Sequence, residues 1–307
     1  MRHHRVARVS VHPALLLAAL AGASSRGASQ ELQAVSGVAP AKGQRVVFIT
    51  GSTGGLGREV ARRLAEDGAH IIVHGRDLDR GSALVTEIQE EGRGSARFYA
   101  ADFASFDEVR GLAAAIRRDY DRLDVLVNNA GIWLEGPRRL SQDGHELHFQ
   151  VNYLSSFLLT RELLPLLEES APARIVHVAS LAQRAIDFDD VMLEKRYSDG
   201  RAYAQSKLAQ IMFNLDLAKE LEGTGVTTNA LHPATMMDTD MVLERGARAW
   251  SSVDEGADAV LQLVNGTEVG TGGYFNETTA ARADDQAYDE EARDRLRALS
   301  EKLTGTG

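Results

Sequence analysis

Short runs of continuous apolar residues, many of them β-branched, alternate with amphipathic segments along most of the chain. No other feature of the sequence constrains the fold as strongly. The apolar runs, which we expect to be strands, cover residues 45–50, 70–75, 96–102, 124–131, 174–180 and 226–233. Strands that are apolar at successive positions, rather than at every second one, are typical of strands buried on both faces. We therefore predict the α/β class, with a doubly wound parallel sheet and helices on both faces.

Amphipathic segments separate these runs. We expect helices over 56–68, 79–92, 106–120, 144–170 and 203–223, and helical cover over the carboxyl edge of the sheet from 236 to 264. Pro165 is expected to kink or break the fourth helix near its end, because proline lacks the N–H that continues a helix. The length of 307 residues suits one large α/β domain. We therefore assign residues 44–307 to a single domain.

Residues 1–43 differ in composition from the rest of the chain. Residues 1–12 are basic and residues 13–23 are apolar and small, which is the pattern of a secretory signal peptide over 1–23. Residues 24–43 are typical of a flexible linker. The apolar run is too short to span a membrane, which takes about 20 residues, so we expect no integral membrane segment. We favour a cytoplasmic protein whose extension is disordered or whose start was assigned too early; export is the alternative if 1–23 is a functional signal.

Charge and composition exclude several classes of function. The formal net charge is −10, which argues against nucleic-acid binding, because that requires a basic face. The chain has no cysteine, so disulfides, thiolate metal sites and thiol catalysis are excluded. No spacing of His, Asp and Glu suggests a metal site. The chemistry must therefore come from hydroxyl, amine or amide groups, or from a bound cofactor.

The stretch 50-TGSTGGLG-57 follows the first expected strand and opens the first expected helix. Gly51 would allow a tight turn, Gly55 a close approach to a diphosphate, and Gly57 close packing of the helix on the sheet. The helix N-terminus would offer N–H groups and a positive dipole end to the phosphates. This position predicts a dinucleotide site of a Rossmann-type domain, with Ser52 and Leu56 also in contact with the cofactor. The spacing is not G-x-G-x-x-G, so an ordinary turn is the alternative.

Arg76 ends the second expected strand and is followed directly by Asp77. In a Rossmann-type fold an acidic residue near this point holds the ribose 2′-hydroxyl of NAD, whereas an arginine accommodates the 2′-phosphate of NADP. Arg58, just after the last glycine, would add a second cation nearby. We therefore predict that NADP(H) is preferred over NAD(H). The alternative is that Arg76 is an ordinary surface charge at a strand end.

Four motifs then follow one another in a familiar order. They are the glycine turn, 128-NNAG-131, Ser180 after the fifth strand, and Tyr203-x-x-x-Lys207. With these motifs the chain resembles the short-chain dehydrogenase/reductase family from about residue 44 to its end. Within that family it is most similar to the retinol-dehydrogenase-like branch, through 146-ELHFQVNYLSSFLLT-160, 175-IVHVASLAQ-183, 203-YAQSKLAQIMF-213 and 231-LHPATMMDT-239.

Two positions depart from that branch. Ala234 stands where the branch usually has the glycine of His-Pro-Gly, and Gln210 stands where it usually has asparagine. We expect Ala234 to alter the backbone path beside the nicotinamide. Neither change is expected to touch an atom that carries the chemistry, so both concern substrate fit more than activity.

The resemblance implies four catalytic residues: Asn152, Ser180, Tyr203 and Lys207. Tyr203 would move the proton. A free phenol, with a pKa of about 10, is a poor base, and an adjacent ammonium lowers that pKa. Residues four apart share a helix face, so Lys207 can lie beside Tyr203 and the cofactor ribose. Ser180 would orient the substrate oxygen, and Asn152 would position a water that links Lys207 to solvent. Singly, each has an ordinary structural reading, such as a packed aromatic or a solvated charge.

The resemblance also implies a set of residues around the cofactor. The loop of Asn129, Ala130 and Gly131 would pack under the adenine ribose, Asp102 and Phe103 would lie beside the adenine, and Pro233 and Thr239 would close over the nicotinamide. Asp102 has the alternative role of capping the helix that follows it. The full expected set is Gly51, Ser52, Gly55, Leu56, Gly57, Arg76, Asp102, Phe103, Asn129, Ala130, Gly131, Tyr203, Lys207, Pro233 and Thr239. His232 is expected to be structural rather than catalytic.

These expectations indicate an NADP(H)-dependent oxidoreductase that acts on a carbonyl or alcohol group of an apolar small molecule. The apolar preference is supported by a set of residues that could line a lid or simply face the core: Met236, Met237, Met241, Val242, Leu243 and Trp250. Two alternatives remain: a cofactor-binding regulator or scaffold without turnover, and an enzyme that acts on an activated C=C bond. The resemblance further implies a homodimer or homotetramer formed through the long helices.

Overall fold

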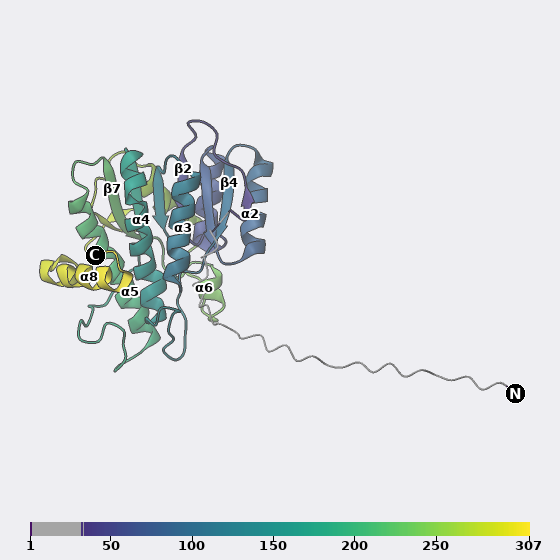
Figure 1. Ribbon diagram of the computed structural model, residues 1–307. Coiled ribbons are helices and arrows are strands. Elements are labelled where there is room, and N and C mark those ends of the chain that lie inside the picture. The colour runs from purple at the N-terminus through teal and green to yellow at the C-terminus, as the bar shows by residue number, and fades with distance from the viewer. Residues whose placement is uncertain (2–31, 33) are drawn as a thin grey trace, which may run out of the picture. The chain divides into compact units, whose positions relative to one another are not determined.

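The computed structural model describes residue 1, residue 32 and residues 34–307 of the chain (Figure 1). The predicted signal peptide over 1–23 lies outside the described residues except for Met1. Cleavage and export therefore stay a prediction. No helix in the described part of the chain is long and apolar enough to cross a membrane.

A mostly parallel sheet forms the centre of the structure, in the order β1-β4-β3-β2-β5-β6-β7-β8-β9. The strands are β1 Ser36–Gly37, β2 Val46–Ile49, β3 His70–Gly75, β4 Ser95–Ala100, β5 Val125–Asn128, β6 Ala173–Val178, β7 Val226–His232, β8 Tyr274–Asn276 and β9 Thr279–Ala280. Neighbours from β4 to β8 pair in parallel, whereas β1 and β9 are antiparallel edge strands. The strand order reverses between β2 and β5, and ligands of open α/β sheets bind at such a reversal.

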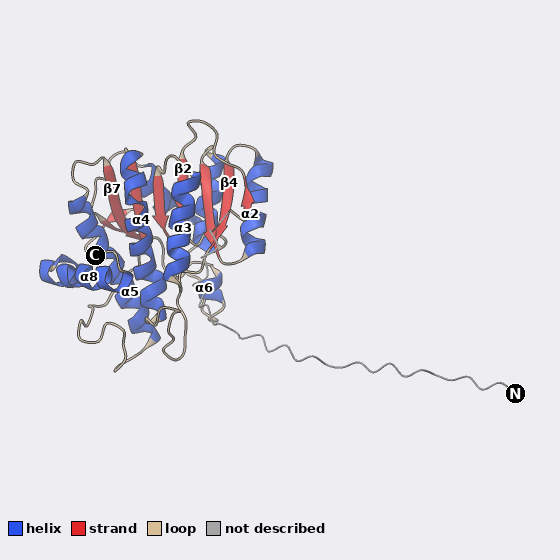
Figure 2. Ribbon diagram, in the orientation of Figure 1, coloured by secondary structure: helices blue, strands red, loops and turns tan. Residues whose placement is uncertain are grey.

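Helices cover both faces of the sheet, as Figure 2 shows. They are α1 Gly55–Glu66, α2 Leu78–Glu91, α3 Phe106–Asp119, the π-helical η1 Phe149–Leu154, α4 Ser155–Glu169, α5 Asp199–Glu220, α6 Asp240–Leu243, α7 Val253–Asn265, the 3₁₀ helix η2 Asp285–Tyr288 and α8 Glu290–Thr304. Successive strand residues face opposite sides. In β2, Val46 and Phe48 pack with α3, α4 and α5, whereas Val47 and Ile49 pack with α1, α2 and α7. The predicted single α/β domain with a doubly wound sheet is therefore confirmed.

The prediction for residues 144–170 is wrong in two respects. Helical structure begins at Leu147, and residues 149–154 form the π-helical η1 rather than an α-helix. Buried Glu146 sets this start, because its carboxylate accepts hydrogen bonds from the N–H groups of His148 and Phe149. Pro165 lies inside α4, which continues to Glu169, so the expected break does not occur there.

The segment predicted to be a linker over residues 24–43 contains a strand. Ser36 and Gly37 form β1 and pair with Phe98 and Arg97 of β4. Gly37 has φ +106°, and a Cβ on it would lie 2.2 Å from the carbonyl oxygen of Ala96. Only glycine fits so close to the neighbouring strand. The linker prediction is therefore wrong at these two residues.

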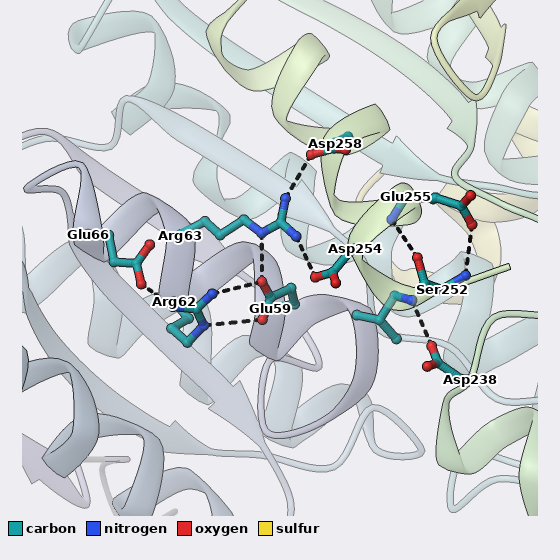
Figure 3. Close-up of polar contacts among 10 residues, drawn as sticks. Glu59, Arg62, Arg63, Glu66, Asp238, Ser252, Asp254, Glu255 and Asp258 are labelled. Atoms are coloured by element: carbon teal, nitrogen blue, oxygen red, sulfur yellow. Dashed lines mark hydrogen bonds and ion pairs between the residues drawn. The ribbon is translucent and has the colours of Figure 1, made fainter.

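Helix α7 is held on α1 by a network of charged side chains (Figure 3). Arg63 of α1 binds Glu59 of its own helix at 2.6 Å and reaches Asp258 of α7 at 2.7 Å. The N-terminus of α7 is closed by a capping box between Ser252 and Glu255. The helix that follows the glycine turn, α1, is thus tied to α7.

Candidate active site

A cavity of about 650 Å³ opens at the carboxyl ends of the parallel strands. It extends from the glycine turn to the helix that carries Tyr203. Of the predicted site residues, Ser52 and Asn152 are not among those that line it. The others that line it are Gly51, Gly55, Leu56, Gly57, Arg76, Asp102, Phe103, Asn129, Ala130, Gly131, Ser180, Tyr203, Lys207, Pro233 and Thr239.

The glycine turn forms one end of this cavity. Gly51 and Gly55 have φ of +65° and +51°, a backbone conformation that other residues rarely adopt. A Cβ on Gly57 would lie 2.4 Å from Nδ2 of Asn129, so Gly57 makes room for the loop after β5. Helix α1 starts behind Gly54, which offers no side-chain cap. Its first N–H groups are therefore available to an anion.

Asn129 and Thr50 join the loop after β5 to this turn. Asn129 Nδ2 donates to the carbonyl oxygen of Thr50 at 2.8 Å, and Thr50 Oγ1 accepts from the N–H of Ala130 at 2.9 Å. Ser52 makes two hydrogen bonds on the inner side of the turn. Its hydroxyl donates to the carbonyl oxygen of Ile49 at 2.8 Å and accepts from the N–H of His74 at 3.0 Å. Ser52 thus shapes the turn from inside the protein.

Two arginines line the cavity near the end of β3. The Arg76 side chain is 67% exposed, with Nη1 3.8 Å from Oδ1 of Asp102. Arg80, in the first turn of α2, also lines the cavity and binds Asp240 of α6 at 2.7 Å. Arg58, the expected second cation, binds Glu87 instead and is not among the lining residues. That expectation is wrong, because α1 directs Arg58 toward α2.

His74 is a cavity residue that the sequence analysis missed. Its Nδ1 accepts a hydrogen bond from the N–H of Gly51 at 3.1 Å, and its Nε2 lies 3.2 Å from the carbonyl oxygen of Ala101. Its ring stacks on Phe103 with a centroid distance of 4.5 Å. Burial lowers the pKa of His74 to about 4, which keeps Nδ1 free to accept. A histidine within an apolar strand was the only signal in the sequence.

Asp102 does not cap the helix that follows it. Its Oδ1 accepts from the N–H of Ala104 at 3.0 Å, whereas α3 is capped by the hydroxyl of Ser105, which accepts from the N–H of Glu108. Asp102 therefore shapes the short loop after β4 and faces the cavity with its neighbour Phe103.

Tyr203 and Lys207 lie on one face of α5, with Lys207 Nζ 5.7 Å from the centre of the Tyr203 ring. The helix starts at Asp199, behind a Ser198 cap, four residues earlier than expected. Ser180 follows β6 and lines the same cavity as Tyr203, whose pKa burial raises and Ser180 lowers. The three side chains that the motifs single out are therefore brought together at the carboxyl edge of the sheet.

Burial dominates the ionisation of both helix residues. It lowers the pKa of Lys207 to about 7 and raises the pKa of Tyr203, while the hydrogen bond from Ser180 opposes that rise. The expected net lowering of the Tyr203 pKa by Lys207 is not what the structure gives. Lys207 Nζ donates instead to the carbonyl oxygen of Val178 at 2.8 Å and to Oε1 of Gln210 at 3.0 Å. The expectation that Gln210 touches no reactive group is therefore wrong.

Asn152 lies in η1, beside α5. Its Oδ1 accepts from the N–H of Ile132 at 2.7 Å, and its Nδ2 donates to the hydroxyl of Ser206 at 2.9 Å. A Cβ on Gly131 would lie 3.4 Å from both Asn152 Oδ1 and Lys207 Nζ. Asn152 thus sits across Gly131 from the lysine, and its π-helical position is one often found at functional sites.

Trp133 is a second lining residue that the sequence analysis missed. Its ring stacks on Tyr203 with a centroid distance of 5.3 Å and an interplanar angle of 29°. Arg245 places its guanidinium carbon 3.6 Å from the centre of the Trp133 ring and binds Glu135 at 2.7 Å. We call residues 233–252 the cover segment. Arg245 therefore holds this segment against the loop after β5, beside Tyr203.

The apolar residues proposed for a lid divide into two groups. Four of them line the cavity: Met236, Met237, Met241 and Val242. Leu243 is 51% exposed and Trp250 is 75% exposed, and neither is among the lining residues. His232 lines the cavity too, and its Nε2 lies 3.0 Å from the hydroxyl of Thr235.

The sequence of the chain matches a known protein family. The short chain dehydrogenase family matches residues 45–250, which include the glycine turn, Ser180, Tyr203 and Lys207. The chain belongs to the short-chain dehydrogenase family. It is thereby an oxidoreductase that acts on alcohol or carbonyl groups and binds a nicotinamide dinucleotide.

Curated proteins and solved structures agree with this membership. Human retinol dehydrogenases 11 and 12 are 36% and 37% identical to the chain, each over 85% of the chain and 86% of the relative. The expected likeness to the retinol-dehydrogenase-like branch is confirmed. A solved structure of an uncharacterized protein from Mycobacterium Paratuberculosis is 30% identical, with a TM-score of 0.71, and covers 88% of this chain and 98% of its own. A short chain dehydrogenase from Burkholderia cenocepacia J2315 in complex with NADP is 29% identical, with a TM-score of 0.62 and coverage of 77% and 97%.

Proposed function

We propose that this protein is an NADP(H)-dependent oxidoreductase that transfers a hydride between the nicotinamide and the carbonyl or alcohol carbon of an apolar small molecule. One observation carries the proposal: a single cavity is lined at one end by the glycine turn with Arg76 and at the other by Ser180, Tyr203 and Lys207. This arrangement can hold a dinucleotide and an oxygen-bearing substrate at once.

The residues around the glycine turn fit the cofactor. The uncapped start of α1 and the positive φ of Gly55 leave backbone N–H groups free for a diphosphate. Asp102 and Phe103 would take the adenine end, and Pro233 and Thr239 the nicotinamide end. When bound, the nicotinamide supplies or accepts the hydride.

Preference for NADP(H) is supported by the charges at the adenine end. The Arg76 guanidinium is largely exposed and pairs only loosely with Asp102, so it can turn to a 2′-phosphate. Arg80, which lines the same region, lies with Nη1 3.5 Å from the position of a Cβ on Gly54. Two guanidinium groups at this end favour the cofactor with the additional phosphate.

Proton transfer falls to the side chains at the other end. Ser180 would hydrogen-bond the substrate oxygen, and Tyr203 would donate its proton to that oxygen in reduction or remove it in oxidation. The charge on Lys207 would stabilise the phenolate that remains after donation. The raised pKa of free Tyr203 makes it protonated at neutral pH, as a general acid must be.

An apolar substrate is supported by the lining of the cover segment. Met236, Met241 and Trp133 add apolar side chains to the lining of the cavity. Relatives of this chain are named retinol dehydrogenases, so apolar aldehydes and retinoids are the first compounds to test.

The test is NADPH oxidation by the purified protein against a panel of aldehydes, ketones and retinoids. We expect turnover with apolar carbonyl compounds, and loss of turnover in Tyr203→Phe by about 10²–10⁴-fold, because the variant lacks the proton donor. NADPH binding by Tyr203→Phe, measured by fluorescence titration, should match that of the wild type. Absence of turnover with every carbonyl compound, or normal turnover by the variant, would reject the proposal.

A further inference from the structure

The side-chain amide of Gln210 lies against the Lys207 ammonium inside the protein. Gln210 is 0% exposed and Lys207 is 4% exposed. Lys207 Nζ donates to Oε1 of Gln210 at 3.0 Å and to the carbonyl oxygen of Val178 at 2.8 Å. An ammonium is a donor only, so it fixes the amide with its oxygen toward Nζ. The two contacts leave one N–H of the ammonium for another acceptor.

The other end of the same amide has no partner. Gln210 Nε2 is buried and makes no hydrogen bond within the described part of the chain. An unpaired buried N–H destabilises a protein, and a methionine of similar length would avoid that cost. Packing alone therefore does not explain a glutamine at this position. The hydrogen bond that its side-chain oxygen accepts from Lys207 explains the glutamine.

Lys207 needs such acceptors to keep its charge. Burial is the cause that lowers its pKa to about 7. The titratable groups that face it are Tyr203 on its own helix and His232 on β7, and the pKa of His232 is itself lowered to about 4 by burial and by Lys207. Ser180 after β6 and Asn152 in η1 are uncharged. Neutral oxygens, rather than a carboxylate, therefore stabilise this ammonium.

We propose that Gln210 is a positioning residue that holds Lys207 in its charged form beside Tyr203 during proton transfer. The inference rests on the proposed function, because it assigns Lys207 the task of stabilising the Tyr203 phenolate. Gln210 and the Val178 carbonyl fix Nζ from one side, and the remaining N–H would be free for a ribose hydroxyl of the cofactor.

The sign of the effect follows from which form Gln210 stabilises. Its oxygen accepts a stronger hydrogen bond from the charged ammonium than from the neutral amine, so removing it lowers the pKa of Lys207 further below its ordinary value. Lys207 is then neutral over more of the neutral pH range. The Tyr203 phenolate loses a neighbouring positive charge and forms only at higher pH. The acid limb of the pH profile for alcohol oxidation therefore moves to higher pH.

The direct test follows Lys207 by NMR in protein labelled with [6-¹³C]lysine, since the sequence holds only five lysines. Lys207→Met identifies the signal by its loss. We expect the pKa of Lys207 to rise in the order Gln210→Met, wild type, Gln210→Glu, with the methionine variant about one unit or more below the wild type. Gln205→Met is the matched control. Gln205 lies on the same helix at 0% exposure and donates to the carbonyl oxygen of Val191, not to Lys207.

A kinetic test separates positioning from packing. The acid limb for alcohol oxidation should move up by about one pH unit in Gln210→Met and stay in place in Gln205→Met. If Lys207 titrates at the same pH whatever residue stands at 210, or if both methionine variants shift the profile alike, the inference is overturned. The order of the Lys207 pKa values is measured by NMR without turnover. A wild-type protein that is inactive on every carbonyl compound would therefore reject the proposed function, whereas the NMR order would still test the contact between Gln210 and Lys207.

Discussion

At the scale of single residues, cofactor choice depends on the exposed guanidinium of Arg76. We expect Arg76→Asp to lower the ratio of kcat/KM with NADPH to that with NADH by about 10–100-fold, because charge-assisted hydrogen bonds to a phosphate are lost and a like charge is introduced. Steady-state kinetics with both cofactors measure the ratio. Arg58→Ala is the control, since Arg58 pairs with Glu87 away from the cavity lining. An unchanged ratio in Arg76→Asp would assign cofactor choice to other groups.

The sequence predicts some site residues well for a physical reason. Tyr203 and Lys207 share a helix face through their spacing alone, and Ser180 lies at a strand end, so local periodicity places all three. His74 and Trp133 could not be found in this way. His74 meets Gly51, twenty-three positions away, and Trp133 meets Tyr203 on another element. Such contacts depend on how the strands pair and not on any local pattern.

The same limit explains the error at Gln210. Its spacing of three from Lys207 permits a contact along the helix. Whether the amide turns to the ammonium depends on burial and on the Val178 carbonyl of β6, which only the assembled structure supplies. For Tyr203, burial raises the pKa against the opposing hydrogen bond from Ser180, and burial is again a property of the whole fold.

At the scale of elements, the cover segment is fixed on one side by Arg80, which binds Asp240, and beside Tyr203 by Arg245. Arg245 stacks on Trp133, donates to the carbonyl oxygen of Trp133 at 3.2 Å and pairs with Glu135. Its side chain is only 15% exposed, so the cation–π contact is partly shielded from water. Thr239 and the cavity-lining methionines belong to the same segment, so the position of this segment affects binding of both the cofactor and the substrate.

We expect Arg245→Ala to loosen the cover segment and raise KM for an apolar carbonyl substrate by about tenfold, with a smaller change in kcat. A shielded cation–π contact contributes about 1–2 kcal/mol, which corresponds to this factor. Steady-state kinetics, with limited proteolysis of residues 233–252, measure both effects. Arg248→Ala is the matched control, because Arg248 is an exposed arginine of the same segment. Equal KM values in the two variants would show that Arg245 does not hold the segment.

Among the elements that escaped prediction, two have causes that are not periodic. The π-helical η1 has the apolar residues of a helix, but buried Glu146 shifts its start. Strand β1 has only two residues and no apolar run, and it exists because Gly37 fits against β4. The buried strands and α1 to α3 were predicted to within a few residues, since uniform apolar runs and glycine stops specify them locally.

At the scale of the whole molecule, the central part of the long helix α5 is enclosed within one chain. Residues 204–214 of α5 are all buried. Helix α8 packs on this side: Arg293, 5% exposed, binds Asp216 of α5 at 2.7 Å, and Tyr153 of η1 hydrogen-bonds Ser300 of α8 at 2.7 Å. In Figure 1, α8 lies across α5. A dimer through the long helices, which the resemblance implied, would need this surface, so the enclosed helices argue against it.

We therefore expect the protein to be a monomer. Light scattering after size exclusion should give the mass of one chain from micromolar concentrations upward.

Arg293→Ala should lower the free energy of unfolding by about 3 kcal/mol, because it leaves Asp216 with a poorer partner. Arg297→Ala, on the exposed side of α8, should lower it by less than about 1 kcal/mol. Chemical denaturation measures both. A stable wild-type dimer, or equal losses in the two variants, would mean that α8 does not close the surface of α5 and that the long helices remain open to a second copy of the chain.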